Sequence, residues 1–160
     1  MDNTDAEGRL ILADALTYMS RTHNPTNLVD VATLTGAIDV ALGDRLTGCF
    51  ATDDGLWELL RRAGEETGQG MWRMPLMRHF LEPMKSDVAD LVNSGRGRGG
   101  GACTAAAFLR EFTDAHARWA HLDIAGVMQA KADSGVLAKG MTGQPTRSLY
   151  RLIKRAAELN

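Results

Sequence analysis

The residues best suited to chemistry lie within the first ten positions of the chain. Asp5, Glu7 and Arg9 alternate with the small residues Ala6 and Gly8. In an extended segment, residues two apart project to the same side, so the two carboxylates and the guanidinium could converge on one ligand. Carboxylate oxygens beside a fixed cation suit a divalent metal together with an anion. An extended segment here therefore predicts a metal and anion site.

The same segment also fits the start of a helix. Thr4 and Glu7 have the spacing of a capping box, directly before an apolar run. The carboxylates of Asp5 and Glu7 would then lie near the positive end of the helix dipole. Gly8 weakens this interpretation, because glycine lowers helix stability. From spacing alone both interpretations stay open, and the cap is the commoner use of so short a motif.

A second motif is the glycine-rich stretch from Ser94 to Gly101, in which residues 95–100 satisfy the pattern G-x-G-x-x-G. Between a strand and a helix, this pattern is typical of a dinucleotide-binding loop. The acidic residue expected about twenty positions later is not clearly present. The alternative is a loop in which glycine lets the backbone approach a neighbouring segment closely. No P-loop motif occurs.

Composition excludes several classes of protein. The chain has 160 residues and a formal net charge of −2, so it has no electrostatic footprint for nucleic acid. No apolar run is long enough to cross a membrane, and no basic segment precedes an apolar one as in a signal peptide. Cys49 and Cys103 have no metal-binding spacing and are expected to be reduced, as in a cytoplasmic protein. The spacing of the four histidines excludes an H-E-x-x-H zinc helix.

Hydrophobic patterns predict alternating strands and helices, and therefore a single α/β domain over residues 1–160 with a largely parallel sheet flanked by helices. Strands are expected at Leu28–Leu34, Leu46–Thr52 and Arg118–Ile124, with an ambiguous one at Ser86–Asn93. Helices are expected at Leu10–Arg21, Ala37–Leu42, Leu56–Glu66 and Ala102–Phe112, and from Pro145 to Leu159.

Ligands of such sheets bind at the carboxyl ends of the strands. Three turns then become candidates for one site. They are the segment after Leu34, the glycine-rich stretch after Asn93, and the loop that begins at Ala125.

The whole chain resembles the leucyl aminopeptidase family, the two-metal cytosol aminopeptidases of the animal type. The resemblance begins with Asn3-Thr4-Asp5-Ala6-Glu7-Gly8-Arg9-Leu10 and continues, in order, through five further segments. These are residues 32–37 (Ala-Thr-Leu-Thr-Gly-Ala), 72–76 (Trp-Arg-Met-Pro-Leu), 101–109 (Gly-Ala-Cys-Thr-Ala-Ala-Ala-Phe-Leu), 119–126 (Trp-Ala-His-Leu-Asp-Ile-Ala-Gly) and 140–147 (Gly-Met-Thr-Gly-Gln-Pro-Thr-Arg).

The resemblance implies a catalytic role at the start of the chain. Asp5 and Glu7 would bind two divalent metal ions, which are zinc, manganese or magnesium. Arg9 would be the catalytic residue that holds a bicarbonate-like anion. The metal ions would polarise a peptide carbonyl and activate a bridging water.

The resemblance also implies a substrate cleft. Leu34 and Gly36 would contact the peptide backbone, and Thr33 would lie in the side-chain pocket. Ala125 and Met128 would form the apolar wall of that pocket. Asn3 and Ala6 would flank the leaving residue. Peptides would be the substrates, leucine-like N-terminal residues the preferred ones, and a cytoplasmic homo-hexamer the assembly.

The remaining metal ligands of the family, a lysine and two aspartates, and its second catalytic lysine, precede the segment that begins at Asn3. None of the lysines in this chain is placed to substitute for them. The chain is therefore expected to be the C-terminal part of the catalytic domain, without its upstream half and the N-terminal domain, and inactive alone. The alternative from another class is a non-catalytic structural or assembly subunit. A nucleotide-binding module is a third option.

Overall fold

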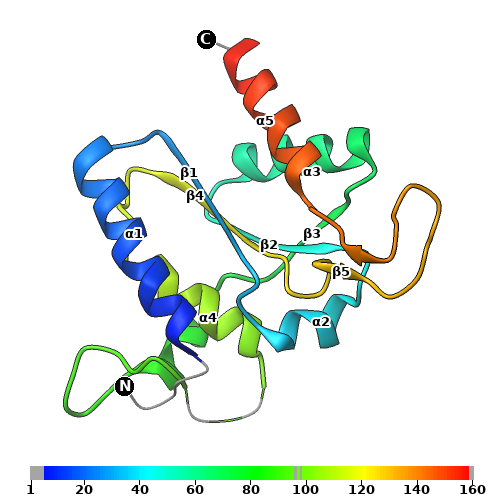
Figure 1. Cartoon of the computed structure of the whole chain (residues 1–160). Coiled ribbons are helices and arrows are strands. Elements are labelled where there is room, and N and C mark those ends of the chain that lie inside the picture. The colour runs from blue at the N-terminus through cyan, green and yellow to red at the C-terminus, as the bar shows by residue number, and fades with distance from the viewer. Residues whose placement is uncertain (1–5, 96, 98, 159–160) are drawn as a thin grey trace.

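The computed structural model describes residues 6–95, 97 and 99–158. Its described part contains one four-stranded sheet with helices packed on both faces (Figure 1). The strands of that sheet are β1 (Asn27–Ala32), β2 (Thr47–Ala51), β3 (Met71–Arg73) and β4 (Arg118–Asp123). The helices are α1 (Glu7–His23), α2 (Gly36–Leu42), α3 (Asp54–Thr67), the 3-10 helix η2 (Arg78–Met84), α4 (Gly101–Arg110) and α5 (Thr146–Glu158).

The sheet is largely parallel, as the sequence predicts. Its strand order is β1-β4-β2-β3. The pairs β1–β4 and β2–β3 are parallel, whereas β2 runs antiparallel to β4. The carboxyl ends of β1 and β4 therefore meet at one edge of the sheet, and those of β2 and β3 lie at the opposite edge. Only the first edge joins turns that the sequence predicts to bind a ligand.

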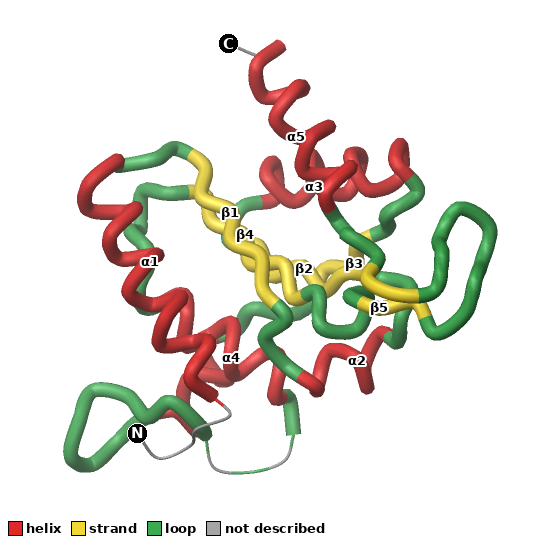
Figure 2. The backbone as a smooth tube through the Cα atoms, viewed as in Figure 1, coloured by secondary structure: helices red, strands yellow, loops and turns green. Residues whose placement is uncertain are grey.

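The helices form a layer on each side of the strands. Helices α1 and α4 and the short α2 cover one face, and α3 and α5 cover the other (Figure 2). Strand β4 lies between two strands and is buried on both faces. Its residues alternate accordingly, so Trp119 belongs to the core under α1 and α4, while Ala120 and Leu122 belong to the core under α3 and α5.

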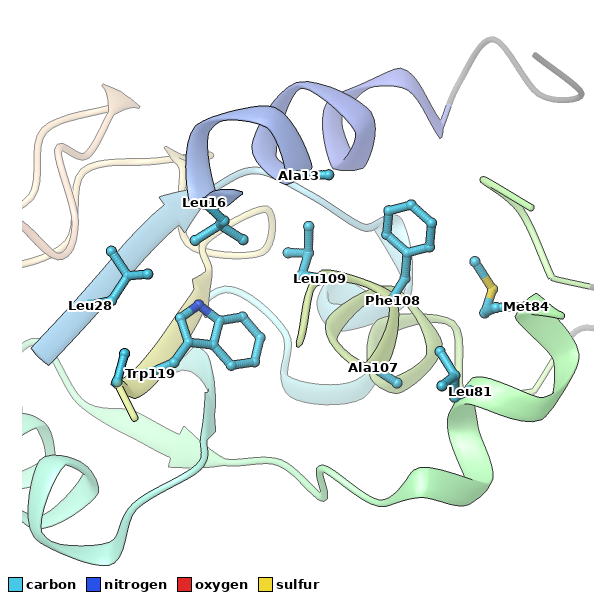
Figure 3. Close-up of a cluster of buried hydrophobic side chains, with 10 residues drawn as sticks. Ala13, Leu16, Leu28, Leu81, Met84, Ala107, Phe108, Leu109 and Trp119 are labelled. Carbon is cyan, nitrogen blue, oxygen red and sulfur yellow. The ribbon is translucent and has the colours of Figure 1, made fainter. Parts of the chain in front are cut away.

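The core under α1 and α4 is centred on an aromatic residue of β4. Figure 3 shows Leu16 of α1, Leu28 of β1 and Leu109 of α4 around the ring of Trp119, which has no exposed surface. This cluster joins α1 to the sheet, although only β1 follows α1 directly along the chain. Apolar contacts of Ala13 and Leu16 therefore hold the middle of α1 against the sheet.

Two sequence predictions need correction. The segment Ser86–Asn93 is not a strand, and only an isolated bridge joins Lys85 to Leu91. Val88 is 97 % exposed and Asp90 is also exposed, while Leu91 and Val92 are half-buried, so the alternation does not produce one buried face that would stabilise a strand. The loop after Ala125 contains a small hairpin, formed by β5 (Gln129–Ala130) and β6 (Gly140–Met141). None of the described helices combines the length and the apolar character needed to cross a bilayer.

Candidate functional site

The motif at the start of the chain lies at the first turn of α1. Glu7 is the first residue of the helix, and Ala6 is the N-cap, with no side chain capping the helix. The extended segment and the Thr4 capping box are therefore both wrong at this point, because Glu7 and Arg9 are helical and Glu7 is not the third residue of the helix. Asn3 and Asp5 lie outside the described residues.

Arg9, in the described part of the motif, has a partly buried guanidinium. Its Nε is buried and has no hydrogen-bond partner among the residues that the structure describes. Burial also lowers the pKa of the Arg9 guanidinium from its ordinary value. A buried N–H without a partner is costly, and an anion would satisfy it. Glu7, by contrast, is exposed at the N-terminal end of α1, where its carboxylate can reach a ligand.

The turn after β1 supplies a second part of the candidate site. Thr33 is exposed, while Leu34 packs partly against the core under α1 and α4. Thr35 is the N-cap of α2, and its hydroxyl accepts a hydrogen bond from the amide of Ile38 at 3.2 Å. Gly36 is the first residue of α2 and is exposed, with open space where a side chain would stand. An approaching backbone could therefore reach the amide of Gly36.

Close contacts place this turn beside the start of α1. A Cβ atom added at Gly8 would lie 3.5 Å from Cδ1 of Leu34. The side-chain nitrogen of Asn93 lies 3.5 Å from the carbonyl oxygen of Ala6, to which it donates. The segments that begin α1, follow β1 and precede the glycine-rich stretch therefore lie together. They come from residues almost ninety positions apart, since 87 separate Ala6 from Asn93.

The third turn, after β4, joins the same group through Asp123. The Asp123 carboxylate accepts hydrogen bonds from the amides of Leu34 and Ala125, at 3.1 and 3.2 Å. Sequence reasoning gave Asp123 no role, although a carboxylate that ends an apolar strand is a signal of buried hydrogen bonds. Met128 lies three residues beyond Ala125, is 38 % exposed, and accepts a bond from the amide of Thr142 at its carbonyl.

The loop after β4 is held close to α2 by a glycine. A Cβ atom added at Gly126 would lie 2.3 Å from the carbonyl oxygen of Gly43, which is the C-cap of α2. Only glycine allows this close approach. The contact places Ala125 against the apolar cluster that includes Ala37 and Ile38 of α2.

The described residues form neither a cluster of metal ligands nor a dinucleotide-binding loop. No group of three or more histidine, cysteine, aspartate or glutamate side chains that could hold a metal ion occurs in the described part of the chain. These residues alone therefore do not form a two-metal centre. The dinucleotide interpretation is wrong in its context, because no strand precedes the glycine-rich stretch. Gly100, with a φ of 66°, is the N-cap of α4, and Arg96 and Arg98 lie outside the described residues.

The fold and the turns at the ends of β1 and β4 define an α/β domain with a candidate site at one edge of its sheet. Residues 1–150 match the family model described as "Cytosol aminopeptidase family, catalytic domain". The chain belongs to this family, whose members are metal-dependent peptidases. The resemblance inferred from the motifs is therefore confirmed.

Named relatives and solved structures agree with this assignment. The chain is 55 % identical to the cytosol aminopeptidase of Dictyostelium discoideum over 156 residues. This alignment covers 97 % of this chain and 30 % of the relative. It is 53 % identical over 161 residues to that of Homo sapiens, covering 100 % and 31 %. The chain thus spans less than a third of the length of these relatives.

Two solved structures share the fold. A mutant of tomato leucine aminopeptidase superposes with a TM-score of 0.89 at 43 % identity, over 97 % of this chain and 29 % of that one. The bottromycin maturation enzyme BotP in complex with Mn gives a TM-score of 0.89 at 38 % identity, over 95 % and 34 %.

Proposed function

We propose that this chain is the C-terminal part of the catalytic domain of a two-metal aminopeptidase that removes N-terminal, preferably leucine-like, residues from peptides. The observation that carries the proposal is the meeting of the first turn of α1 with the turn after β1. There a buried Arg9 nitrogen without a described partner lies on the helix that begins beside Leu34. The family membership supports the same function.

In this proposal the carboxylates at the start of the chain serve the metal ions. Asp5 and Glu7 supply two ligands, and the others come from sequence outside this chain. The ions are zinc, manganese or magnesium, since oxygen ligands accept all three. Bound metal ions would polarise the peptide carbonyl and lower the pKa of a water. Arg9 supplies a fork of N–H groups that binds a planar anion such as bicarbonate through two oxygens.

The remaining residues bind the substrate. The Leu34 carbonyl and the Gly36 amide contact the peptide backbone, and Thr33 lies in the side-chain pocket. Ala125 and Met128 form its apolar wall. Asn3 and Ala6 flank the leaving residue. The names of the relatives support a cytoplasmic location, and a homo-hexamer is the assembly we propose for the complete enzyme.

The decisive experiment joins this chain to the rest of a related enzyme. Residues 1–160 replace the matching segment of the human cytosol aminopeptidase, and hydrolysis of leucine anilide is measured with added manganese or zinc. We expect the folded chimera to be active and the 160-residue chain alone to be inactive. An inactive but folded chimera would contradict the enzyme, and full activity of the chain alone would contradict the shared site.

A single substitution sharpens this experiment. Glu7→Gln removes one metal ligand while keeping the size of the side chain, so activity of the chimera should fall by roughly 100-fold or more. Asp14→Asn changes an exposed carboxylate on the same helix and is the matched control, which should remain active. Retained turnover in the Glu7 variant would mean that Glu7 only begins α1 and binds no metal ion.

A non-catalytic assembly subunit is the second candidate. It is favoured by the finding that the described residues do not form a group of metal ligands. Sedimentation combined with the activity assay distinguishes the two, because both would assemble but only the enzyme would confer activity.

A further inference from the structure

A single buried carboxylate connects the two turns that we assign to the substrate. Asp123 ends β4 and is 1 % exposed. Its Oδ1 accepts hydrogen bonds from the amides of Leu34, Thr35 and Ala125, at 3.1, 3.4 and 3.2 Å. Its Oδ2 accepts a hydrogen bond from the Thr35 hydroxyl at 2.6 Å. Both oxygens therefore have partners, as a buried carboxylate requires.

The parallel pairing of β1 with β4 brings these groups together. Asp123 stands opposite Ala32, the last residue of β1, so the chain leaving β1 passes directly beside the carboxylate. The amide of Ile124 donates to the carbonyl of Ala32 and continues the ladder by one residue. Each turn therefore starts from a fixed strand end and is then held by the same side chain.

The hydrogen bond to Thr35 determines where the Leu34 carbonyl points. The bond between Leu34 and Thr35 is not among the cis peptides of the structure, so its N–H and C=O point in opposite directions. The Thr35 amide points toward the buried Asp123 carboxylate. The Leu34 carbonyl consequently points away from it, and its direction is fixed by a residue 89 positions along the chain.

The same carboxylate also orders the start of α2. The Thr35 hydroxyl donates to Asp123 and accepts from the amide of Ile38, so its orientation is fixed from both sides. Thr35 in this position begins the helix at Gly36. The first amides of a helix have no partner within it, and the Gly36 amide has none among the described residues; a Cβ atom added at Gly36 would meet nothing within 4 Å, so a ligand can approach this residue.

We propose that Asp123 is the positioning residue of the substrate cleft. It aims the Leu34 carbonyl and the Gly36 amide at the peptide backbone and fixes Ala125 in the wall of the pocket. Asp123 contacts neither the substrate nor the metal ions and acts only through these groups. The inference rests on the proposed function, since that function assigns the three residues to the substrate.

The test uses the chimera and two conservative variants. Asp123→Asn keeps an acceptor for the amides but presents an N–H to the Thr35 hydroxyl, which loses its acceptor. Thr35→Val removes the hydroxyl and keeps the shape, whereas Thr35→Ser restores the hydroxyl. We expect KM for leucine anilide to rise by roughly tenfold in the Asn and Val variants, as expected when bonds that orient one contact are lost, and to stay near normal in the Ser variant. kcat and bound manganese should change little.

A merely structural role gives a different result. Ser148→Ala is the matched control, because Ser148 is fully buried and hydrogen-bonded to Gln69, on the other face of the sheet. Its loss should lower stability without raising KM. A fall in kcat at unchanged KM in Asp123→Asn would overturn the proposal.

A second measurement separates this inference from the proposed function. Amide exchange of Leu34, Thr35 and Ala125 should accelerate in Asp123→Asn, even in a chimera without activity. The affinity for a leucine dipeptide with a reduced scissile bond should fall by the same factor as KM rises. Unchanged exchange, or accelerated exchange with unchanged affinity, would overturn the positioning role. An inactive wild-type chimera that still binds the analogue would contradict only the enzyme.

Discussion

Asp30 on β1 holds two ring nitrogens of β4 inside the protein. Its Oδ2 accepts from Nε1 of Trp119 at 2.8 Å, and its Oδ1 lies 2.6 Å from Nδ1 of His121. His121 has no exposed surface and stacks between Phe50 and Trp119. Asp30 and His121 are opposite each other in the parallel pair, so the contact fixes the register of β1 on β4.

Removing this carboxylate should strongly destabilise the chain. Asp30→Ala leaves the buried Nε1 of Trp119 and the buried Nδ1 of His121 without their hydrogen-bond partner, and we expect the free energy of unfolding to fall by about 3 kcal/mol. Urea unfolding followed by Trp fluorescence measures it. Asp14→Ala, an exposed carboxylate on α1, is the control and should change little. Equal effects of the two variants would contradict the role of Asp30.

For single residues, the sequence identifies candidates for the site more reliably than it predicts the secondary structure in which they lie. The motif marks Glu7 and Arg9 as candidate site residues, but spacing alone leaves both an extended segment and a helix capped by Thr4 open, whereas the helix begins at Glu7 after the N-cap Ala6. The helix is favoured because Ala13 and Leu16 pack into the core under α1 and α4. Such tertiary contacts override local preference, and they are not visible in a ten-residue window.

Helices α3 and α5 are joined by charged side chains over an apolar contact. Glu66 of α3 accepts hydrogen bonds from Arg151 at 2.5 Å and from Arg155, both on α5. The bond from Arg151 is the main cause of the lowered pKa of the Glu66 carboxyl. Within α3, bonds from Arg61 and Arg62 lower the pKa of Glu58 to about 2. These carboxylates bind protons more weakly in the folded state than in the unfolded one.

The sign of the pH dependence follows from these shifts. A carboxyl whose pKa is lowered by folding stabilises the fold above its unfolded pKa, and this contribution is lost as the pH falls. The loss should begin near pH 4.5 and, for Glu58, extend to about pH 2. Urea midpoints between pH 7 and pH 3 measure it. Glu66→Gln should reduce the dependence, whereas Asp14→Asn should not; a pH-independent midpoint would contradict the assignment.

Two glycines of the site should respond oppositely to the same substitution. Gly126→Ala places a Cβ atom 2.3 Å from the Gly43 carbonyl, so the backbone must shift, at a cost of about 2 kcal/mol or more. Gly36→Ala meets nothing within 4 Å in the first turn of α2 and should stabilise the chain by roughly 0.5 kcal/mol. Thermal unfolding compares the two. Equal Tm changes would contradict the close approach.

Most helices and strands could be predicted because their hydrophobic patterns match the faces that the fold buries. The inner face predicted for α3 is buried at Leu56, Leu60 and Ala63 and half-buried at Leu59. The segment Ser86–Asn93 has the alternation of a strand, but its exposed and half-buried residues do not alternate, so the pattern corresponds to no single buried face. Asp123 could not be given its role from the sequence, because its partners are 88 and 89 positions away and pairing of β1 with β4 is needed to bring them close.

The two central strands of the sheet, β4 and β2, are buried. In the described part, β1 pairs with a strand on one side only. Strand β2 is buried along its whole length, and Cys49 lies in it without exposed surface. Burial raises the pKa of the Cys49 thiol to about 12, so the reactive thiolate is scarce at neutral pH.

Labelling of Cys49 should therefore report opening of the sheet. We expect no alkylation by iodoacetamide at pH 8 in the folded chain, and rapid alkylation once urea has unfolded it. The labelled fraction, measured by peptide mass spectrometry, should follow the urea transition. Cys103 at the start of α4 is the internal comparison, with 6 % exposure and a thiol pKa that is also raised by burial. Fast labelling of Cys49 in the folded chain would contradict a closed sheet.

The pairing of β1 with β4 also sets an order of events during synthesis. Asp30 and His121 are 91 residues apart, so a ribosome making about 5–20 residues per second exposes β1 for roughly 5–20 s before its partner exists. During that interval Leu28, Val29 and Val31 lack β4, the strand with which they pair in the described fold. The nascent chain is therefore expected to need protection by chaperones until β4 has emerged.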